Sequence, residues 1–278
     1  MSITTPLEVS SDELARIVGG SHHDPHSILG PHVHGDAVTV RVLRPMAERV
    51  SIIADGKAHP LRHEHGGIWV GVLPGSVVPD YRLEVTYQDG LTIRTDDPYR
   101  FLPTLGELDL HLVSEGRHER LWDVLGAHVR TYDTPNGPVT GTAFAVWAPN
   151  ARGVRVIGDF NYWNGRGHPM RSLGSSGVWD LFVPDIGDGT CYRYEILGPD
   201  GVWRQKADPM AFRAEVPPAS ASVVFDSSYT WHDDAWMAAR AERAPHASPM
   251  SIYEVHLGSW RRDLSYRQLA EQLVEYVT

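Results

Sequence analysis

The chain has 278 residues, a formal net charge of -10 and 42% hydrophobic residues, which together predict about two globular domains. Only Lys57 and Lys206 are lysines and no basic stripe is present, so a surface for nucleic acid is excluded. Because Cys191 is the only cysteine and no apolar run has the length of a membrane span or a signal peptide, we expect a cytoplasmic protein without disulfides or a membrane partner.

The first predicted element is a short helix near the N-terminus. Hydroxyl and carboxylate side chains from Ser10 to Glu13 begin this helix, and Gly19-Gly20 ends it. The apolar residues on one of its faces are Leu14, Ile17 and Val18. We expect this helix to act as an N-terminal lid.

Histidines follow this helix and raise the question of a metal site. They are His22, His23, His26, His32, His34, His63 and His65. Histidine is the commonest metal ligand, but no cysteine accompanies these residues, and the first of them lie in a proline-containing loop rather than on one helix face. We therefore expect turn and surface histidines and no metal.

The strongest pattern in the chain is an internal repeat. Residues 38–101 recur as residues 143–212, and from Tyr81, which corresponds to Tyr192, the offset is constant at 111 residues. Other matched residues are Trp69 with Trp179, Asp89-Gly90 with Asp200-Gly201, and Asp97-Pro98 with Asp208-Pro209. Such a period is too long for a solenoid unit and matches an independent domain. The sequence therefore predicts two related domains.

Each copy of the repeat has the pattern of short strands. Val38, Val40 and Val42 alternate with polar residues, and further β-rich runs are separated by proline and glycine clusters. Asp89-Gly90 and Asp200-Gly201 lie between such runs, where glycine tolerates the positive φ of a tight hairpin. Many short strands separated by turns predict two antiparallel sandwiches.

Two segments between and after the copies are predicted to be linkers. Apolar residues in 108–128 follow helical spacing around Trp122 and predict a connecting helix that runs to His128. Residues 231–246 are rich in alanine, arginine and acids and are followed by prolines, which indicates a second linker.

The C-terminal segment is predicted to be a strand followed by a helix. Residues 250–257 alternate as a strand does, and a capping box at Ser265 and Gln268 begins the helix. A strand followed by a helix is half of a βαβ unit, which requires a further parallel strand. We therefore expect the front of a longer protein, interrupted in the first helix of an α/β domain.

An aromatic loop, residues 158–165, follows a strand of the second copy. We expect Trp163 to share one end of the sandwich with Arg193 and Trp203, where flat indoles and a polar donor suit sugar rings. The corresponding loop of the first copy, at Asp55, has no tryptophan. The alternative is that these tryptophans are core aromatics that cap the sandwich.

No catalytic arrangement is recognisable in the sequence. A retaining glycosidase needs two carboxylates about 5 Å apart in a cleft, and no such pair stands out. We expect turn and strand-edge positions for Asp159, Asp180, Glu195 and Asp208. A Ser-His-Asp arrangement, a phosphate loop and a dinucleotide fingerprint are also absent from the sequence, so no cofactor is expected.

Four motifs together resemble a known family. They are His22–Gly30, Gly158–Trp163, Ala207–Pro209 and Tyr253–Trp260. The chain resembles, over nearly all its length, the N-terminal part of bacterial glycogen branching enzymes, the 1,4-α-glucan branching enzymes of glycoside hydrolase family 13. This implies that the second copy is a family 48 carbohydrate-binding module and the first is the divergent extra copy of many bacterial branching enzymes.

The resemblance also implies which residues bind carbohydrate. In the related glycogen-binding module of a kinase regulatory subunit, glucan stacks on two tryptophans beside a basic residue. When the motifs are matched, the two tryptophans correspond to Trp163 and Trp203. The basic residue, a lysine in that module, corresponds to Arg193. The expected partner is an α-1,4-glucan such as glycogen.

The implied fold is mainly β, with two tandem immunoglobulin-like β-sandwich domains followed by the first strand and helix of a truncated (β/α)8 barrel. The expected boundaries are 1–20 for the N-terminal helix, 21–105 for the first sandwich, 106–132 for a helical linker, 133–226 for the second sandwich, 227–249 for a linker and 250–278 for the start of the catalytic barrel.

The resemblance also implies which part of the parent protein carries out catalysis and which part binds glucan. The family's catalytic aspartate, glutamate and second aspartate follow later barrel strands, so they are expected beyond Thr278, with the missing barrel as a partner in cis. The parent is then a glycosyltransferase of glycogen biosynthesis that cleaves α-1,4-glucan and transfers the piece to form α-1,6 branches. This chain alone is expected to be inactive and to supply glucan binding and positioning.

Three alternatives remain open at this point. A debranching or trehalose-forming enzyme shares one such module and a similar barrel entry, whereas two tandem copies and the ending His256–Trp260 favour branching. A stand-alone glucan-binding or regulatory module explains the sandwiches but not the C-terminal strand and helix. A purely structural pair of immunoglobulin-like domains predicts no glucan affinity.

Overall fold

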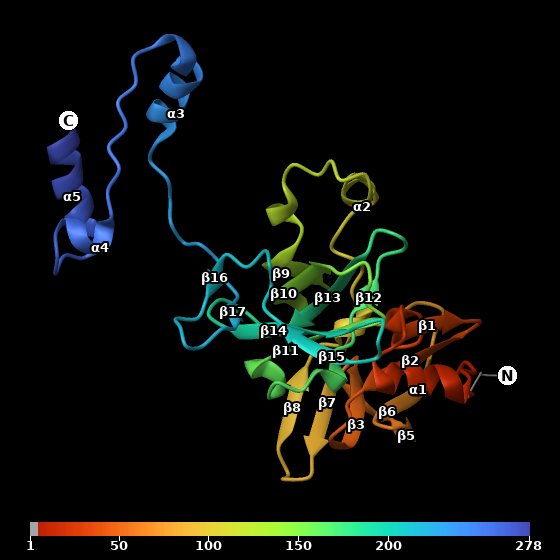
Figure 1. The fold of residues 1–278 in the computed structure, drawn as a ribbon. Helices are drawn as coiled ribbons and strands as arrows, with labels where there is room; N and C mark the ends of the chain where they lie inside the picture. The colour runs from red at the N-terminus through yellow and green to blue at the C-terminus, as the bar shows by residue number, and fades with distance from the viewer. Residues whose placement is uncertain (1–4) are drawn as a thin grey trace. The chain divides into compact units, whose positions relative to one another are not determined.

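The computed structural model describes residues 5–278 and shows a mainly β protein with four antiparallel sheets (Figure 1). The chain forms two compact units, one that ends at Ser227 and one from Ser228 to Thr278. The α-helices are α1 (Ser11–Gly19), α2 (Glu107–Ser114), α3 (Asp234–Ala241), α4 (Leu257–Trp260) and α5 (Tyr266–Val277). Within the described residues, no helix is both long enough and apolar enough to cross a membrane.

The first repeat copy consists of two four-stranded sheets that share one apolar cluster. Their strand orders are β1-β2-β6-β5 and β4-β3-β7-β8. The strands are β1 (Gly30–His34), β2 (Ala37–Leu43), β3 (Ala47–Ala54), β4 (Lys57–Pro60), β5 (Arg62–His65), β6 (Ile68–Pro74), β7 (Tyr81–Tyr87) and β8 (Thr92–Thr95). Since successive side chains of a strand point to opposite faces, alternate residues fill the cluster, among them Val38, Val40, Val42, Val50, Ile52, Leu83 and Val85.

The second copy also consists of two sheets. Their strand orders are β12-β13-β10-β9 and β11-β14-β17-β16, and β15 pairs with β14. The strands are β9 (Gly126–Thr134), β10 (Gly137–Trp147), β11 (Gly153–Gly158), β12 (Arg171–Ser172), β13 (Val178–Pro184), β14 (Cys191–Leu197), β15 (Trp203–Lys206), β16 (Arg213–Ala214) and β17 (Ser222–Val223). The predicted hairpins at Asp89-Gly90 and Asp200-Gly201 are confirmed, since they join β7 to β8 and β14 to β15.

The core of the second copy extends into the first half of the chain. One apolar cluster contains Leu14 and Ile17 of α1 and Tyr99 from the end of the first copy, together with Phe144 and Trp179 of the second. The Tyr99 hydroxyl also donates to the Pro169 carbonyl at 3.1 Å. In Figure 1 the strands of the first copy, red to yellow, accordingly adjoin those of the second, green to cyan. The two copies therefore form one packed unit.

The repeat in the sequence corresponds to repeated hydrogen bonds in the structure. The hydroxyl of Tyr81 donates to Asp97 Oδ2 at 2.7 Å, and that of Tyr192 donates to Asp208 Oδ2 at 2.6 Å. The matched indoles also behave alike, since each donates to the carbonyl of the residue before a matched proline. These bonds are Trp69 Nε1 to Arg44 at 3.3 Å and Trp179 Nε1 to Ala148 at 3.1 Å. Both copies therefore use the same side chains to fix the same turns.

Strand β2 is buried on both faces, although its alternating sequence is typical of a strand with one polar face. Thr39 and Arg41 are buried because the N-terminal segment covers them, with the Leu7 amide donating to Thr39 Oγ1 at 3.0 Å. Arg41 is neutralised by Glu64, since its Nε lies 2.8 Å from Glu64 Oε2. A buried charge is tolerated here because it is paired.

Helix α1 forms where it was predicted. The Ser10 hydroxyl accepts from the Glu13 amide at 3.2 Å, and Gly20 ends the helix with a φ of 73°. This helix was expected to act as a lid, but it packs into the core, because Leu14 and Ile17 are buried in the shared cluster. Its last turn lies against β11, where a side-chain carbon on Gly153 would come within 2.1 Å of the Gly20 carbonyl oxygen.

This close approach makes Gly153→Ala a test of the contact between α1 and β11. The added methyl group is expected to lower the free energy of unfolding by about 1–3 kcal/mol, because the atom in its way belongs to the backbone and cannot rotate aside. Urea unfolding measures the difference. Gly187→Ala is the matched control, since nothing lies within 4 Å of a methyl group at that position. Equal stability of the two variants would contradict the tight packing of α1.

The linker between the copies differs from its prediction. The helix within residues 106–132 is α2, and Leu121–Asp123 form only a single 3₁₀ turn. Residues 126–132, expected in the helical linker, belong to β9, because β9 pairs with β10 along its full length. The apolar spacing that predicted a helix as far as His128 has another cause. Apolar residues such as Leu121 and Leu125 cover the outer face of the sheet beside Ala145.

The unit from Ser228 to Thr278 is helical in the structure. The predicted helix is confirmed as α5, and the Ser265 hydroxyl accepts from the Gln268 amide at 3.4 Å. Helix α3 lies within residues 227–249, which were expected to be a linker. The strand expected at residues 250–257 is wrong, because residues 250–256 are extended without ladder bonds and α4 begins at Leu257. A strand requires a neighbour, and the described residues supply none at this position.

Candidate functional site

The candidate site begins with a loop after β11 that a single asparagine holds in place. Asn161 Oδ1 accepts from the Gly158 amide at 3.0 Å, and its Nδ2 donates to the Val156 carbonyl at 3.0 Å. The same Nδ2 lies 3.1 Å from His168 Nδ1. Burial lowers the pKa of His168 to about 3, so the ring is neutral near pH 7 and Nδ1 can accept this bond.

Trp163 follows this turn and pairs with Arg193. The indole is 36% exposed, and the Arg193 guanidinium carbon lies 5.8 Å from the centroid of its ring. Arg193 Nη2 donates to Ser220 Oγ at 2.6 Å, which holds the cation in position. The start of the loop is also tied to β14, since Asp159 Oδ2 accepts from the Cys191 amide at 3.0 Å. An exposed aromatic face beside a fixed cation results.

Trp203 belongs to a different pair. It lies on β15 opposite Leu197, and the guanidinium carbon of Arg155 is 4.2 Å from the centroid of its ring. Arg155 Nη2 also donates to the Gly19 carbonyl of α1 at 2.6 Å. Burial lowers the pKa of Arg155 from its ordinary value. One face of the Trp203 indole is therefore covered by a buried arginine.

The three residues expected at one end of the sandwich share a face of the sheet but do not converge. Arg193 lies opposite Ile157, and Trp203 lies opposite Leu197. Arg193 and Leu197 are four residues apart on β14, which is about 13 Å along a strand. The structure brings Arg193 to Trp163, whereas Trp203 pairs with Arg155.

Sequence reasoning missed Tyr162, the residue before Trp163. Its side chain is 88% exposed, and its φ of 53° lies in the left-handed region, as does the φ of 59° of Trp163. Neighbouring Phe160 instead packs against the core and stacks on Phe144, with ring centroids 6.0 Å apart. The sequence places three aromatic residues in one short loop, and no pattern in it shows which of them faces solvent.

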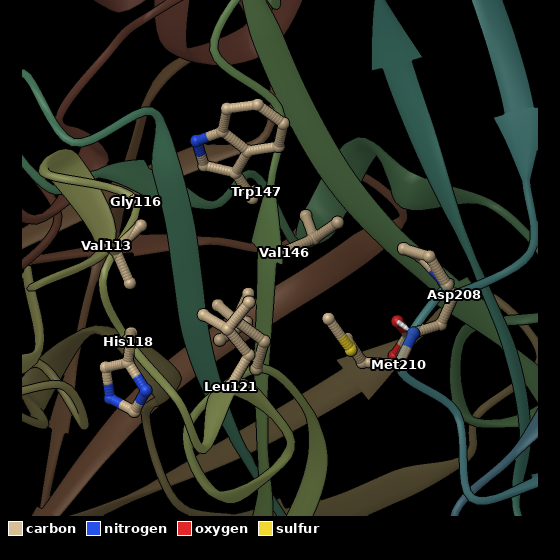
Figure 2. A pocket seen from close by; sticks show the side chains of 11 residues that line it. Val113, Gly116, His118, Leu121, Val146, Trp147, Asp208 and Met210 are labelled. Carbon is tan, nitrogen blue, oxygen red and sulfur yellow. Dashed lines mark hydrogen bonds between the residues drawn. The ribbon is translucent and has the colours of Figure 1, made fainter.

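A pocket of about 350 Å³ lies beside helix α2 (Figure 2). Val113, Leu121, Ala145, Val146 and Met210 are among the residues that line it. Its polar groups are already bonded, since His118 Nε2 lies 3.1 Å from Asp109 Oδ1 and Asp208 accepts from Tyr192. With no free donor or acceptor among these groups to orient sugar hydroxyls, this pocket is a poor glucan site.

Two of the histidines pack against buried aromatic rings. The ring of His23 stacks on Trp179 with centroids 5.7 Å apart, and that of His26 lies edge-on to Tyr99 at 5.0 Å. Burial lowers the pKa of His26 to about 2. Among residues 5–278, no group of three or more His, Cys, Asp or Glu side chains is placed to hold a metal ion.

Two of the carboxylates expected at turns and strand edges are buried, although Asp208 is at a turn as expected, where its Oδ1 accepts from the Met210 amide at 2.8 Å. Asp180 is in the middle of β13 and is fully buried, with Arg171 Nε 2.7 Å from its Oδ1. Asp208 accepts from Tyr192, and burial raises its pKa. Each has partners for its buried oxygens, so each is structural.

Comparisons with known proteins add an independent finding. Residues 10–99 match the family model of the alpha-1,4-glucan branching enzyme GlgB, N-terminal domain, and residues 124–211 match that of carbohydrate-binding module 48, the isoamylase N-terminal domain. The 1,4-alpha-glucan branching enzyme GlgB of Frankia casuarinae is 60% identical over 98% of this chain and 34% of its own length. That of Thermobifida fusca is 61% identical over 95% of this chain and 36% of its own.

The chain thus spans about a third of the length of these relatives. Among solved structures, the type I pullulanase of Bacillus subtilis str. 168, complexed with maltose, is 20% identical over 73% of this chain and 28% of its own, with a TM-score of 0.32.

Proposed function

This chain belongs, over nearly its whole length, to the N-terminal part of the GlgB branching-enzyme family, and we propose that it binds and positions α-1,4-glucan for such an enzyme. The proposed parent reaction cleaves an α-1,4-glucan and transfers the piece to form an α-1,6 branch in glycogen biosynthesis. We assign no catalytic role in this reaction to any residue of this chain. The observation that carries the proposal is the exposed Trp163 beside Arg193, within the residues that match a carbohydrate-binding module.

The chemistry of this pair suits a sugar chain. The C–H faces of glucose pack on an indole, and the hydroxyls at the ring edge accept hydrogen bonds from a guanidinium. Arg193 is held beside the ring by Ser220, so little side-chain freedom is lost when glucan binds. Trp203 contributes less in this proposal, because Arg155 already lies over its ring.

The proposal extends to the fold and to the remainder of the parent enzyme. We infer that each repeat copy is one immunoglobulin-like sandwich and that the protein acts in the cytoplasm. The unit from Ser228 to Thr278 has exposed apolar side chains, among them Ile252, which is 85% exposed. We propose that a catalytic barrel in cis packs on these side chains, because burial of such apolar area is favourable. The high identity to branching enzymes makes a debranching enzyme or a stand-alone module less favoured.

Trp163→Ala is expected to weaken glucan binding about fivefold, because it removes a stacking face that contributes about 1 kcal/mol. The measurement is retention of the purified chain during native electrophoresis in gels that contain glycogen. Trp203→Ala is expected to have a smaller effect, since Arg155 covers one face of that ring.

Trp147→Ala is the control for this experiment, because Trp147 is 57% exposed and its indole donates to the Ser176 carbonyl of a different loop. Its retention is expected to equal that of wild type. If folded Trp163→Ala is retained as strongly as the control, Trp163 is not a binding residue and the proposed site is wrong.

A further inference from the structure

Tyr162 occupies an unfavourable backbone conformation without any compensating contact of its own. Bulky residues rarely adopt positive φ, yet Tyr162 and Trp163 do so in succession, at 53° and 59°. The Tyr162 phenol is 88% exposed and, within residues 5–278, has neither a hydrogen bond nor a ring contact. Glycine would adopt the same backbone at no steric cost. The folded state thus has no hydrogen bond or ring contact of the phenol, among the described residues, to offset this backbone conformation.

The surrounding loop is built to maintain this conformation. The Trp163 amide donates to the Gly158 carbonyl at 3.0 Å, and the Asn161 side chain bonds to the backbone of Gly158 and Val156, which precede the turn. Residues in strained backbone persist only where neighbouring structure fixes them, and such residues cluster at ligand sites. The strain therefore points to a role for the Tyr162 ring outside the folded chain itself.

We propose that Tyr162 is a further sugar-contacting side chain, so that one α-1,4-glucan chain lies on Trp163 and extends onto the phenol. This proposal rests on the proposed glucan site. The α-carbons of neighbouring residues are about 3.8 Å apart, so successive glucose rings can reach both side chains. The phenol offers an aromatic face to C–H groups and a hydroxyl that can donate to or accept from a sugar hydroxyl.

Tyr162→Gly separates binding from stability, because the two are expected to change in different directions. The Tm of this variant should equal or exceed that of wild type, since glycine relieves the strained φ. Its affinity for maltoheptaose, measured by isothermal titration calorimetry, should fall about threefold through loss of one stacking face.

Two further variants exclude a loosened loop as the cause. Tyr162→Asn keeps a residue that tolerates this backbone but has no ring, and it should lose as much affinity as Tyr162→Gly. Tyr162→Phe keeps the ring and should retain most of the affinity. Asp55→Gly is the matched control, because Asp55 has a φ of 48° in the corresponding turn of the first copy. That control should leave the affinity for maltoheptaose unchanged.

The outcomes distinguish this inference from the function on which it rests. If Trp163→Ala weakens binding while Tyr162→Gly and Tyr162→Asn bind as wild type, the role of Tyr162 is wrong and the glucan site stands. If Trp163→Ala also binds as wild type, the site itself is wrong. A Tyr162→Gly variant with a Tm well below that of wild type would show that the ring stabilises the fold and would overturn the argument from strain.

Discussion

Trp179→Ala is expected to lower the free energy of unfolding by about 3–5 kcal/mol, the cost of removing a large side chain from a packed core. The indole is 2% exposed and lies in the cluster that joins α1 and both repeat copies. It stacks on His23 and donates to the Ala148 carbonyl at 3.1 Å. The alanine variant loses both contacts, leaves a cavity and leaves the Ala148 carbonyl without this bond.

Urea unfolding followed by circular dichroism measures this loss. Trp147→Ala is the control, because Trp147 lies on the neighbouring strand β10 but is 57% exposed. It should change the free energy of unfolding by less than about 1 kcal/mol. A loss for Trp179→Ala no larger than that of the control would show that the shared cluster is not the stabilising core.

Lowering the pH from 6 to 5 is expected to destabilise the unit that ends at Ser227 by about 2–3 kcal/mol. Burial lowers the pKa of His26 to about 2 and that of His168 to about 3, from an ordinary value of 6.5. Below pH 6.5 the unfolded chain therefore binds protons that the folded chain does not. The stability of the folded state is full above that pH and falls by about 1.4 kcal/mol per pH unit for each histidine.

His26→Phe tests this explanation, because both ring nitrogens of His26 are buried and have no hydrogen-bond partner among the described residues. The variant should halve the dependence of the unfolding free energy on pH between 6 and 5, as measured by urea unfolding at each pH. His111→Asn is the control, since the His111 side chain is 63% exposed. Burial raises the pKa of Asp97 and Asp208, which therefore add stability as the pH falls and oppose the effect of the two histidines. An unchanged slope in His26→Phe would show that His26 is not a source of the acid sensitivity.

Features set by neighbouring residues could be predicted from the sequence. The repeat, both Asp-Gly hairpins and the capped helices α1 and α5 depend on spacing and turn chemistry within a few residues. The strand predicted at residues 250–257 failed because strand formation depends on a partner that the local sequence does not show. Asp180 was misplaced for a similar reason, since its partner Arg171 and the segment that covers it come together only in the fold.

The candidate site was predicted only in part. The sequence identified Trp163 and Arg193, which the structure brings together. It did not show that Trp203 lies on β15 opposite Leu197, which is four residues beyond Arg193 on β14, because strand register is a property of the whole sheet. The exposure of Tyr162 depends on two consecutive positive φ angles. Tyrosine and tryptophan rarely adopt such angles, so the sequence does not predict them.

The core that joins the two copies limits how the second copy can be reused. A fusion protein that borrowed residues 124–211 as a portable glucan tag would leave behind Leu14, Ile17 and Tyr99. The apolar surface that these residues cover would then face water, and exposed apolar patches promote association between molecules. A transferable tag from this protein has to begin before α1 and include the first copy.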